Sequence, residues 1–250
     1  MTALTNYAEN ALLDHILSTT AWTMPTNTYV KLHTGDPGED ATLNAATEAL
    51  RKVLSFGAAA SAAIETDAAV DWDNVSTTET YSHFSIWDAL TGGNPLCYGA
   101  FAASYSVTAG DDFQIPIGDI DLSFNTAMTT AAANAALDHL TGTSAWTMPV
   151  GTFVKLHTGA PGTAAAANAA TETTRADGGA FSASVAGASD NDAAINWTSV
   201  STSETITDFS VWDAVTAGSP LLIGALGTSR ALTAGQDARF SAGALAVTLA

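Results

Sequence analysis

Both halves of the chain contain the same two sequence motifs. AWTMP and YVKLHTG occur in residues 21–35, and AWTMP and FVKLHTG occur in residues 145–159. Matching residues stay 124 or 125 positions apart along almost the whole sequence. Solenoid repeats are only about 20 to 50 residues long, so each copy is expected to be a complete domain with its own core. We therefore predict a duplication with domains at 1–125 and 126–250.

Each copy begins with a helical pattern. Asn6 stands where an N-cap is expected, and Glu9 follows three residues later, as in a capping box. The second copy has the same spacing of apolar residues from about 130 to 140. Gly142 follows, and glycine is typical of a helix C-terminus. One short helix is predicted at the start of each domain.

The rest of each copy has the patterns of short strands. Residues 28–34 alternate between apolar and polar side chains, as in a strand with one buried face. Further alternating stretches are separated by turn signals and lie at 52–56, 81–88, 96–103 and 113–124. Strands without intervening helices favour an antiparallel sandwich or barrel. The predicted fold is mainly β, with two tandem domains that each combine a short N-terminal helix and an antiparallel β-sandwich, jelly-roll or immunoglobulin-like.

The composition supports two folded cores. The chain has 250 residues, 47% hydrophobic content and a mean hydropathy of +0.17, which is enough apolar material for two domains. No window has the roughly 18 consecutive apolar residues of a membrane span, and the start lacks the pattern of a signal peptide. We expect a soluble protein that is synthesised in the cytoplasm and has no membrane partner. The lone Cys97 is replaced by Leu222 in the second copy and should be a buried apolar residue.

The charge excludes one class of partner. The net charge is −18, and such a chain would be repelled by nucleic-acid phosphates. Only 13% of the residues are charged, against about 25% in ordinary domains. Ala, Thr and Ser take their place, which is common in virion proteins that make extensive contacts but can also reflect genome composition alone.

Histidines are the first candidates for chemistry. Asp14-His15 and Asp138-His139 lie on the predicted helices, but adjacent helical residues do not face each other. We expect them at solvated or interface positions on the helix flank.

His33 and His157 share a face of a predicted strand with Lys31 and Lys155, and together they would form a polar stripe. A histidine-based metal site needs at least a third ligand, and the sequence has neither H-x-H, H-E-x-x-H nor paired cysteines. A structural or interface role is expected for both histidines.

A calcium loop is a weaker alternative in the first copy. Asp36, Glu39, Asp40 and Glu48 carry suitable oxygens, but their spacing does not match the EF-hand pattern. The second copy keeps only Glu172. We expect a solvated loop there, with no metal and no cofactor.

No catalytic motif stands out. The sequence lacks G-x-S-x-G and the glycine-rich phosphate loops. Acids shared by both copies are spread over the module, so spacing indicates no pair of catalytic carboxylates. The chain is predicted not to be an enzyme.

Aromatic residues recur instead at matched positions. A tryptophan can bury on the order of 200 Å², so matched tryptophans are usually core or interface anchors. An exposed platform that binds sugar is the alternative. The candidate anchors, which include two histidines, are Trp22, Trp72, Trp87, Trp146, Trp197, Trp212, His33 and His157.

Several segments resemble a family of small tailed-phage virion proteins, often called tail fibre proteins, that usually consist of one such module. The resemblance is carried by residues 4–15, 22–25, 29–34, 84–89, 96–100 and 240–249. It implies a virion structural protein without catalytic residues. This chain differs in having two modules and no fibrous stalk.

These observations lead to three hypotheses about function. The first is a capsid decoration or minor capsid (cement) protein on the outside of the head, bound to the major capsid protein and other virion proteins. The second is a tail fibre or tail-associated adhesin that binds host glycans, and the third is a virion enzyme. We also expect a homo-oligomer; in a trimer, six modules would match a six-fold environment on the shell.

Overall fold

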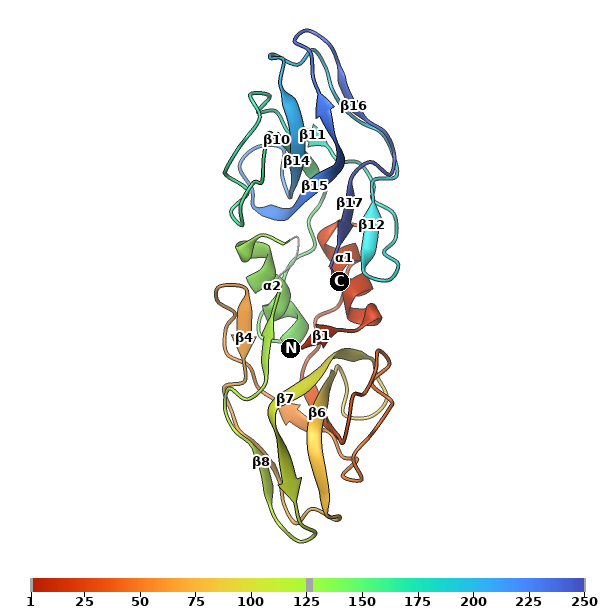
Figure 1. The fold of residues 1–250 in the computed structure, drawn as a ribbon, viewed down its shortest axis with the longest axis vertical. Helices are drawn as coiled ribbons and strands as arrows, with labels where there is room; N and C mark the ends of the chain where they lie inside the picture. The colour runs from red at the N-terminus through yellow and green to blue at the C-terminus, as the bar shows by residue number, and fades with distance from the viewer. Residues whose placement is uncertain (1, 125–127, 250) are drawn as a thin grey trace. The chain divides into compact units, whose positions relative to one another are not determined.

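The computed structural model describes residues 2–124 and 128–249 (Figure 1). The elements of the first repeat are β1 (Ala3–Leu4), α1 (Asn6–Ile16), β2 (Thr28–His33), β3 (Lys52–Leu54), β4 (Ala63–Glu65), β5 (Val70–Trp72), β6 (Glu79–Trp87), β7 (Pro95–Val107), β8 (Phe113–Ile115) and β9 (Asp121–Ser123). Those of the second are α2 (Thr130–Thr141), β10 (Phe153–His157), β11 (Ala176–Asp177), β12 (Ala188–Asp190), β13 (Ile195–Trp197), β14 (Thr205–Trp212), β15 (Pro220–Ala231), β16 (Ala238–Phe240) and β17 (Ala246–Thr248).

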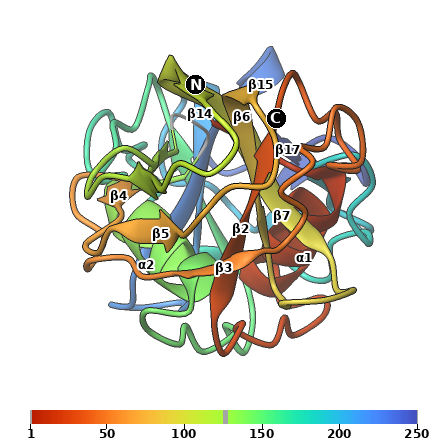
Figure 2. The ribbon, with the colours of Figure 1, turned by 90° about the horizontal axis from the view of Figure 1, so that it is seen from below.

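Each repeat forms one larger antiparallel sheet and two small ribbons. The first has the strand order β1-β7-β6-β2-β3, with β4 paired to β9 and β5 to β8. Strands β2, β6 and β7 lie side by side in its larger sheet (Figure 2). The second has the order β11-β10-β14-β15, with β12 paired to β17 and β13 to β16. The prediction of two similar, mainly β domains with an N-terminal helix is confirmed.

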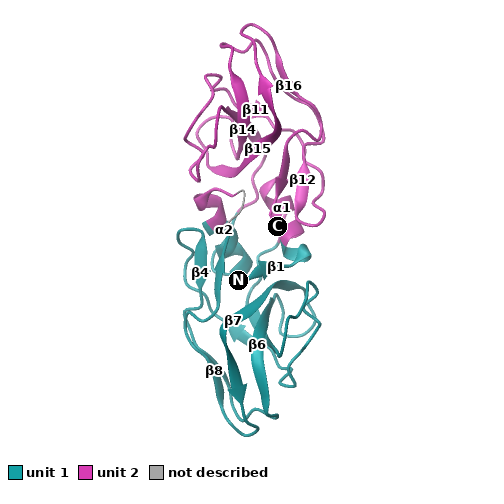
Figure 3. Cartoon of the chain, viewed as in Figure 1, with its two compact units in different colours: residues 1–8, 23–124, 134–146 teal, residues 9–22, 125–133, 147–250 magenta. Residues whose placement is uncertain are grey.

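The compact units of the structure are not the two sequence repeats. Unit 1 consists of residues 1–8, 23–124 and 134–146, and unit 2 consists of residues 9–22, 125–133 and 147–250 (Figure 3). Most of each helix therefore belongs to the unit built from the strands of the other repeat. The predicted domain boundary between residues 125 and 126 lies outside the described residues.

Hydrogen bonds tie helix α1 into unit 2. The side-chain oxygen of Asn10 accepts from the Gly187 amide at 2.9 Å, and Asp14 Oδ1 accepts from the Ser184 amide at 2.7 Å. The apolar side chains of α1, such as Leu12, are fully buried. Backbone amides of a loop thus find side-chain acceptors on a helix that comes from the other repeat.

Helix α2 makes the equivalent bonds in unit 1. Asn134 Oδ1 accepts from the Ala62 amide and Asp138 Oδ1 from the Ala59 amide, both at 2.7 Å. The same residue types thus make the same contacts in both units.

The N-cap of the first helix differs from the prediction. Thr5, not Asn6, caps the helix, because Thr5 Oγ1 accepts from the Ala8 amide at 3.2 Å. The Thr5 hydroxyl also donates to Pro95 O on β7 at 2.6 Å. This bond holds the Thr5 side chain at the start of the helix, so the N-cap lies one residue before the predicted one. Helix α2 ends as predicted before Gly142, whose φ of 79° is left-handed.

The cores contain most of the large apolar residues. Val30, Leu32, Phe84 and Ile86 of unit 1 are at most 1% exposed. Cys97 is buried as expected, and burial raises the pKa of its thiol.

Candidate functional site

A buried polar cluster surrounds His33 in unit 1. His33 Nδ1 lies 2.8 Å from Leu43 O, and its Nε2 lies 2.8 Å from Ser85 Oγ. A carbonyl oxygen can only accept, so Nδ1 carries the proton and Nε2 accepts the Ser85 hydroxyl proton. Ser85 Oγ in turn accepts from Trp87 Nε1 at 2.8 Å. The histidine, serine and tryptophan therefore form one connected hydrogen-bond relay.

Unit 2 contains the same relay. His157 Nδ1 lies 2.9 Å from Ala167 O and its Nε2 lies 2.8 Å from Ser210 Oγ, which accepts from Trp212 Nε1 at 2.8 Å. The two strands that carry it are β10 and β14, in the register of β2 and β6. Both repeats thus preserve one geometry.

The relay resembles the pairing of a nucleophile with a base, but it is closed. His33 and Ser85 are both 0% exposed, and the serine hydroxyl donates its one proton to His33 and accepts from Trp87. Burial lowers the pKa of His33 from 6.5 to about 4, so the imidazole is neutral at pH 7. The expected polar stripe is wrong at this position, because the loop that ends at Leu43 covers the histidine.

An arginine stacks on the tryptophan of each relay. The Arg51 guanidinium carbon lies 3.6 Å from the Trp87 ring centroid, and its Nη1 donates to Ala89 O at 2.7 Å and to Gly92 O at 2.6 Å. The arginine therefore ties the turn after β6 to the sheet.

Arg175 does the same in unit 2. It lies 3.6 Å from the Trp212 ring centroid and donates to Ala214 O and Ala217 O, both at 2.6 Å. Stacking and hydrogen bonding together make this a structural anchor for a loop rather than an open ligand site.

The remaining predicted anchors lie elsewhere. Trp72 packs against Phe113 and Trp197 against Phe240, with ring centroids 5.5 and 5.6 Å apart. Neither Trp72 nor Trp197 belongs to a relay. Trp22 and Trp146 are half-buried after the helices, and their backbone amides donate to His15 and His139 Nδ1, both at 3.0 Å.

Of the two positions expected for the helix histidines, solvated or interface, the solvated one is wrong. His15 and His139 are 2% and 3% exposed. The Nδ1 atom of each accepts from a backbone amide of the segment that follows its own helix, so this buried nitrogen has a hydrogen-bond partner.

Two carboxylates of the acidic loop in unit 1 accept hydrogen bonds from the protein itself. Asp36 Oδ1 accepts from the Gly38 amide at 2.9 Å, and Glu39 accepts from the Asn6 amide and the Tyr98 hydroxyl. Within residues 2–124 and 128–249, no group of three His, Cys, Asp or Glu side chains could hold a metal ion.

Unit 2 has a groove that is open to a ligand. It has a volume of about 610 Å³ and lies beside the second half of β15. Pairing with β14 passes from Ala225 directly to Arg230, so residues 226–229 form a bulge without ladder partners. The groove is lined by Leu226, Thr228, Ser229, Arg230, Phe240 and Ser241, among others.

The equivalent place in unit 1 is filled by aromatic side chains. Tyr105, at the position of Arg230, packs its ring against Phe101 and Phe113 at centroid distances of 5.3 and 5.2 Å. Its hydroxyl donates to Asp119 Oδ2 at 2.6 Å. Burial, together with this carboxylate, raises the pKa of Tyr105 to about 12.

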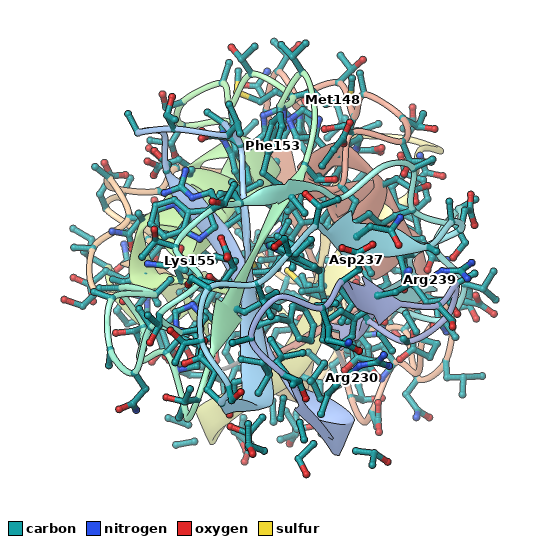
Figure 4. All side chains as sticks on the ribbon, turned by 90° about the horizontal axis from the view of Figure 1, so that it is seen from above. Met148, Phe153, Lys155, Arg230, Asp237 and Arg239 are labelled. Carbon is teal, nitrogen blue, oxygen red and sulfur yellow. The ribbon has the colours of Figure 1, made fainter. Side chains whose placement is uncertain are left out.

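In unit 1, Phe101, Tyr105, Phe113 and Asp119 thus form a plug, and three of these four residues are replaced by smaller ones in unit 2. Leu226, Ala238 and Ala244 stand in place of Phe101, Phe113 and Asp119. Arg230 lies over the Phe240 ring at 5.7 Å from its centroid. Arg230 and Arg239 lie on the side of the unit opposite Lys155 (Figure 4). The groove thus combines a guanidinium, hydroxyls and an apolar wall.

Comparison with known proteins agrees with the duplication. The family model described as "Podophage GP4 fiber I protein gp80" matches residues 3–123 and again residues 127–248. The chain belongs to the Gp80 family. No curated protein matches it.

The two matches cover nearly all of this Gp80-family chain, which confirms the predicted resemblance to phage fibre-type proteins and the tandem duplication. The chain is accordingly a phage fibre-like structural protein. In the part of the chain that the structure describes, no helix is long and apolar enough to cross a membrane.

Two features of this Gp80 member were not predicted from its sequence. The first is the pairing of His33 with Ser85, because the partners lie 52 positions apart. The groove was also missed, although a signal exists: aligning the repeats shows Tyr105 and Asp119 of the first replaced by Arg230 and Ala244 in the second.

Proposed function

We propose that this protein is a non-enzymatic fibre component of a tailed-phage virion. The observation that carries the proposal is the match of a podophage fibre family to both repeats. The closed Ser-His relays support a structural role, because their serine and histidine side chains are buried in the sheets. Its partners are then other virion proteins.

Localisation on the virion tests this proposal. Cryo-electron microscopy of purified virions, with an antibody against this chain as a second probe, should place it in the tail fibres. Density over the capsid lattice would instead favour the decoration role that the sequence analysis put first, with the major capsid protein as partner. Absence from purified virions would contradict both.

The groove of unit 2 favours a second function, the binding of an acidic saccharide of the host surface. Because the net charge of −18 repels long polyanions such as nucleic acid, the expected ligand is a short saccharide with a carboxylate that pairs with Arg230. A guanidinium binds a carboxylate with two parallel hydrogen bonds. Thr228, Ser229 and Ser241 line the same groove and carry the hydroxyls that sugar recognition uses, while Leu226 supplies an apolar wall.

Calorimetric titration of the full chain with oligogalacturonate tests saccharide binding. We expect one site per chain, since the plug of Tyr105 and Asp119 closes the equivalent place in unit 1. Arg230→Ala should weaken binding by about tenfold or more, as expected for a charge-assisted contact of about 1.5–3 kcal/mol.

Two control variants sharpen the result. Arg239→Ala removes a nearby exposed arginine that does not line the groove, and binding should persist. Arg230→Tyr with Ala244→Asp removes the guanidinium and introduces the tyrosine and aspartate that bond to each other in unit 1, and it should abolish binding. Equal binding of inorganic phosphate and oligogalacturonate, or unchanged binding by Arg230→Ala, would contradict saccharide recognition.

A further inference from the structure

Each unit contains a small docking site for a helix, which we call the helix cradle. The cradle of unit 1 is the loop of residues 59–62, and that of unit 2 is the loop of residues 184–187. Each cradle presents two backbone amides three residues apart to two helical side chains four residues apart. Helical residues four apart lie on the same face, so both acceptors reach one loop together.

The helix in each cradle comes from the other repeat. Asn10 and Asp14 of α1 hold the cradle of unit 2, and α2 holds the cradle of unit 1 with the same residue types. The apolar face of α1 is buried as well, since Leu12, Leu13 and Ile16 are 0% exposed. A repeat separated from its partner would therefore lack a helix in its cradle and expose its own helix.

One residue pair favours the exchanged arrangement over the direct one. Gly187 of the unit 2 cradle has no side chain, and a Cβ there would lie 2.5 Å from Glu9 Oε2 and 3.3 Å from Glu9 Cβ. The equivalent cradle residue of the first repeat is Ala62. If α1 occupied the cradle of its own repeat, the buried Glu9 would meet that methyl group. The helix that takes the Ala62 cradle instead has Ala133 at the position of Glu9.

We propose that reciprocal helix exchange is the device by which two copies of this module pair, and that this chain is such a pair joined end to end. The occupant of each cradle is the helix of a second copy of the repeat. The connection between the repeats keeps the pair together at any concentration but is not what creates the docking. The proposal does not depend on where the protein lies in the virion.

Cutting the full chain between its repeats tests the proposal. A protease site inserted after Phe124 allows the folded protein to be cleaved without unfolding it. We expect the two halves to elute together in size-exclusion chromatography, with the mass of one intact chain by light scattering. Separation of the native halves into two monomers, each with its own helix, would overturn the proposal.

Matched variants distinguish helix docking from any other contact between the halves. Asp14→Ala with Asp138→Ala removes one of the two helical side chains that accept from each cradle. Asp112→Ala with Asp237→Ala removes one carboxylate that binds a backbone amide in each unit, away from the helices. The first pair should raise the dissociation constant of the cleaved halves by about tenfold or more, and the second should leave it unchanged. Equal effects of the two pairs would also contradict the proposal.

Discussion

Several acids shared by both repeats accept hydrogen bonds from backbone amides. Glu79 accepts from the Thr47 amide at 3.0 Å, and Asp88 accepts from the Asn94 amide at 2.7 Å. Their counterparts Glu204 and Asp213 make the same kind of bond in unit 2. Asp88 and Asp213 bind the turn that follows their own strand, whereas Glu79 and Glu204 bind a loop about 32 positions earlier. Each of these carboxylates accepts from a backbone amide, which explains why the sequence showed matched acids without any paired spacing.

The buried histidines make stability depend on pH. The pKa of His33 is about 4 in the folded chain and near 6.5 when unfolded, so protons bind preferentially to the unfolded state between these values. Stability is therefore full above pH 6.5 and is lost as pH falls toward 4. The loss from His33 is at most about 3 kcal/mol. Denaturant unfolding at several pH values measures it.

A histidine variant isolates this contribution from the carboxylates. His33→Asn should lower stability at pH 7 and flatten its dependence on pH between 6.5 and 4, while titration of the acids stays the same in both proteins. The burial of His157 also lowers its pKa, so His33→Asn with His157→Asn should flatten the curve further. A slope unchanged in both variants would show that the histidines become protonated within the folded state.

Stacking on Trp87 makes Arg51 sensitive to a conservative change. Arg51→Lys keeps the charge but loses the planar group that donates to Ala89 O and Gly92 O. We expect a loss of about 1–2 kcal/mol in the free energy of unfolding. Lys52→Ala, at the next residue, is the control and should change stability by less than about 0.5 kcal/mol. Equal effects would mean that the stacked guanidinium adds no stability.

Elements with strong local patterns were predictable, and short ones were not. The helix before Gly142 and strand β2 follow their hydrophobic periodicity closely. Strands β4 and β5 have three residues each, too few for a period to be recognised. The stretch 113–124 forms two strands rather than one, because the left-handed Gly118 lies in the turn between them.

The docking of α1 depends on the missing side chain of Gly187. Gly187→Ala should destabilise unit 2, because the added methyl group meets Glu9 and because a φ of 68° is strained for alanine. We expect a loss of about 1–3 kcal/mol in the free energy of unfolding. Chemical denaturation measures this loss.

Two comparisons separate the contact from the backbone strain. Gly179 has a similar φ of 65° with nothing within 4 Å of an added Cβ, so Gly179→Ala reports strain alone and should cost less. Adding Glu9→Ala to Gly187→Ala recreates the residues found at positions 133 and 62 and should restore part of the loss. If Gly187→Ala costs no more than Gly179→Ala, the Glu9 contact has no energetic weight.

The exchange of helices between repeats could not be read from the duplicated pattern. Asn10 and Asp14 have identical counterparts in Asn134 and Asp138, so the hydrogen-bonding residues fit either cradle. The sequence therefore indicates that a helix accompanies each set of strands but not which copy supplies it. The difference between Glu9 and Ala133 carries such information, but its meaning depends on the contact of Glu9 with Gly187, 178 positions away.

Charge is distributed unevenly between the two units. Unit 1 contains 15 acids and three Lys or Arg residues, and unit 2 contains 10 acids and four. Repulsion between like charges destabilises a compact state, so we expect it to destabilise unit 1 more than unit 2. Salt relieves this repulsion, because the screening length falls from about 30 Å at 0.01 M to about 8 Å at 0.15 M.

Hydrogen exchange should therefore respond to salt differently in the two units. Amides of β6 in unit 1 should gain more protection between these salt concentrations than the matched amides of β14 in unit 2. The two strands occupy equivalent sheet positions, so β14 serves as the internal control for β6. Replacing the exposed Asp71 and Asp73 of unit 1 by Asn should reduce the difference. Equal gains in β6 and β14 would mean that the two units open only together, so that the charge of the whole chain, not of each unit, sets the response.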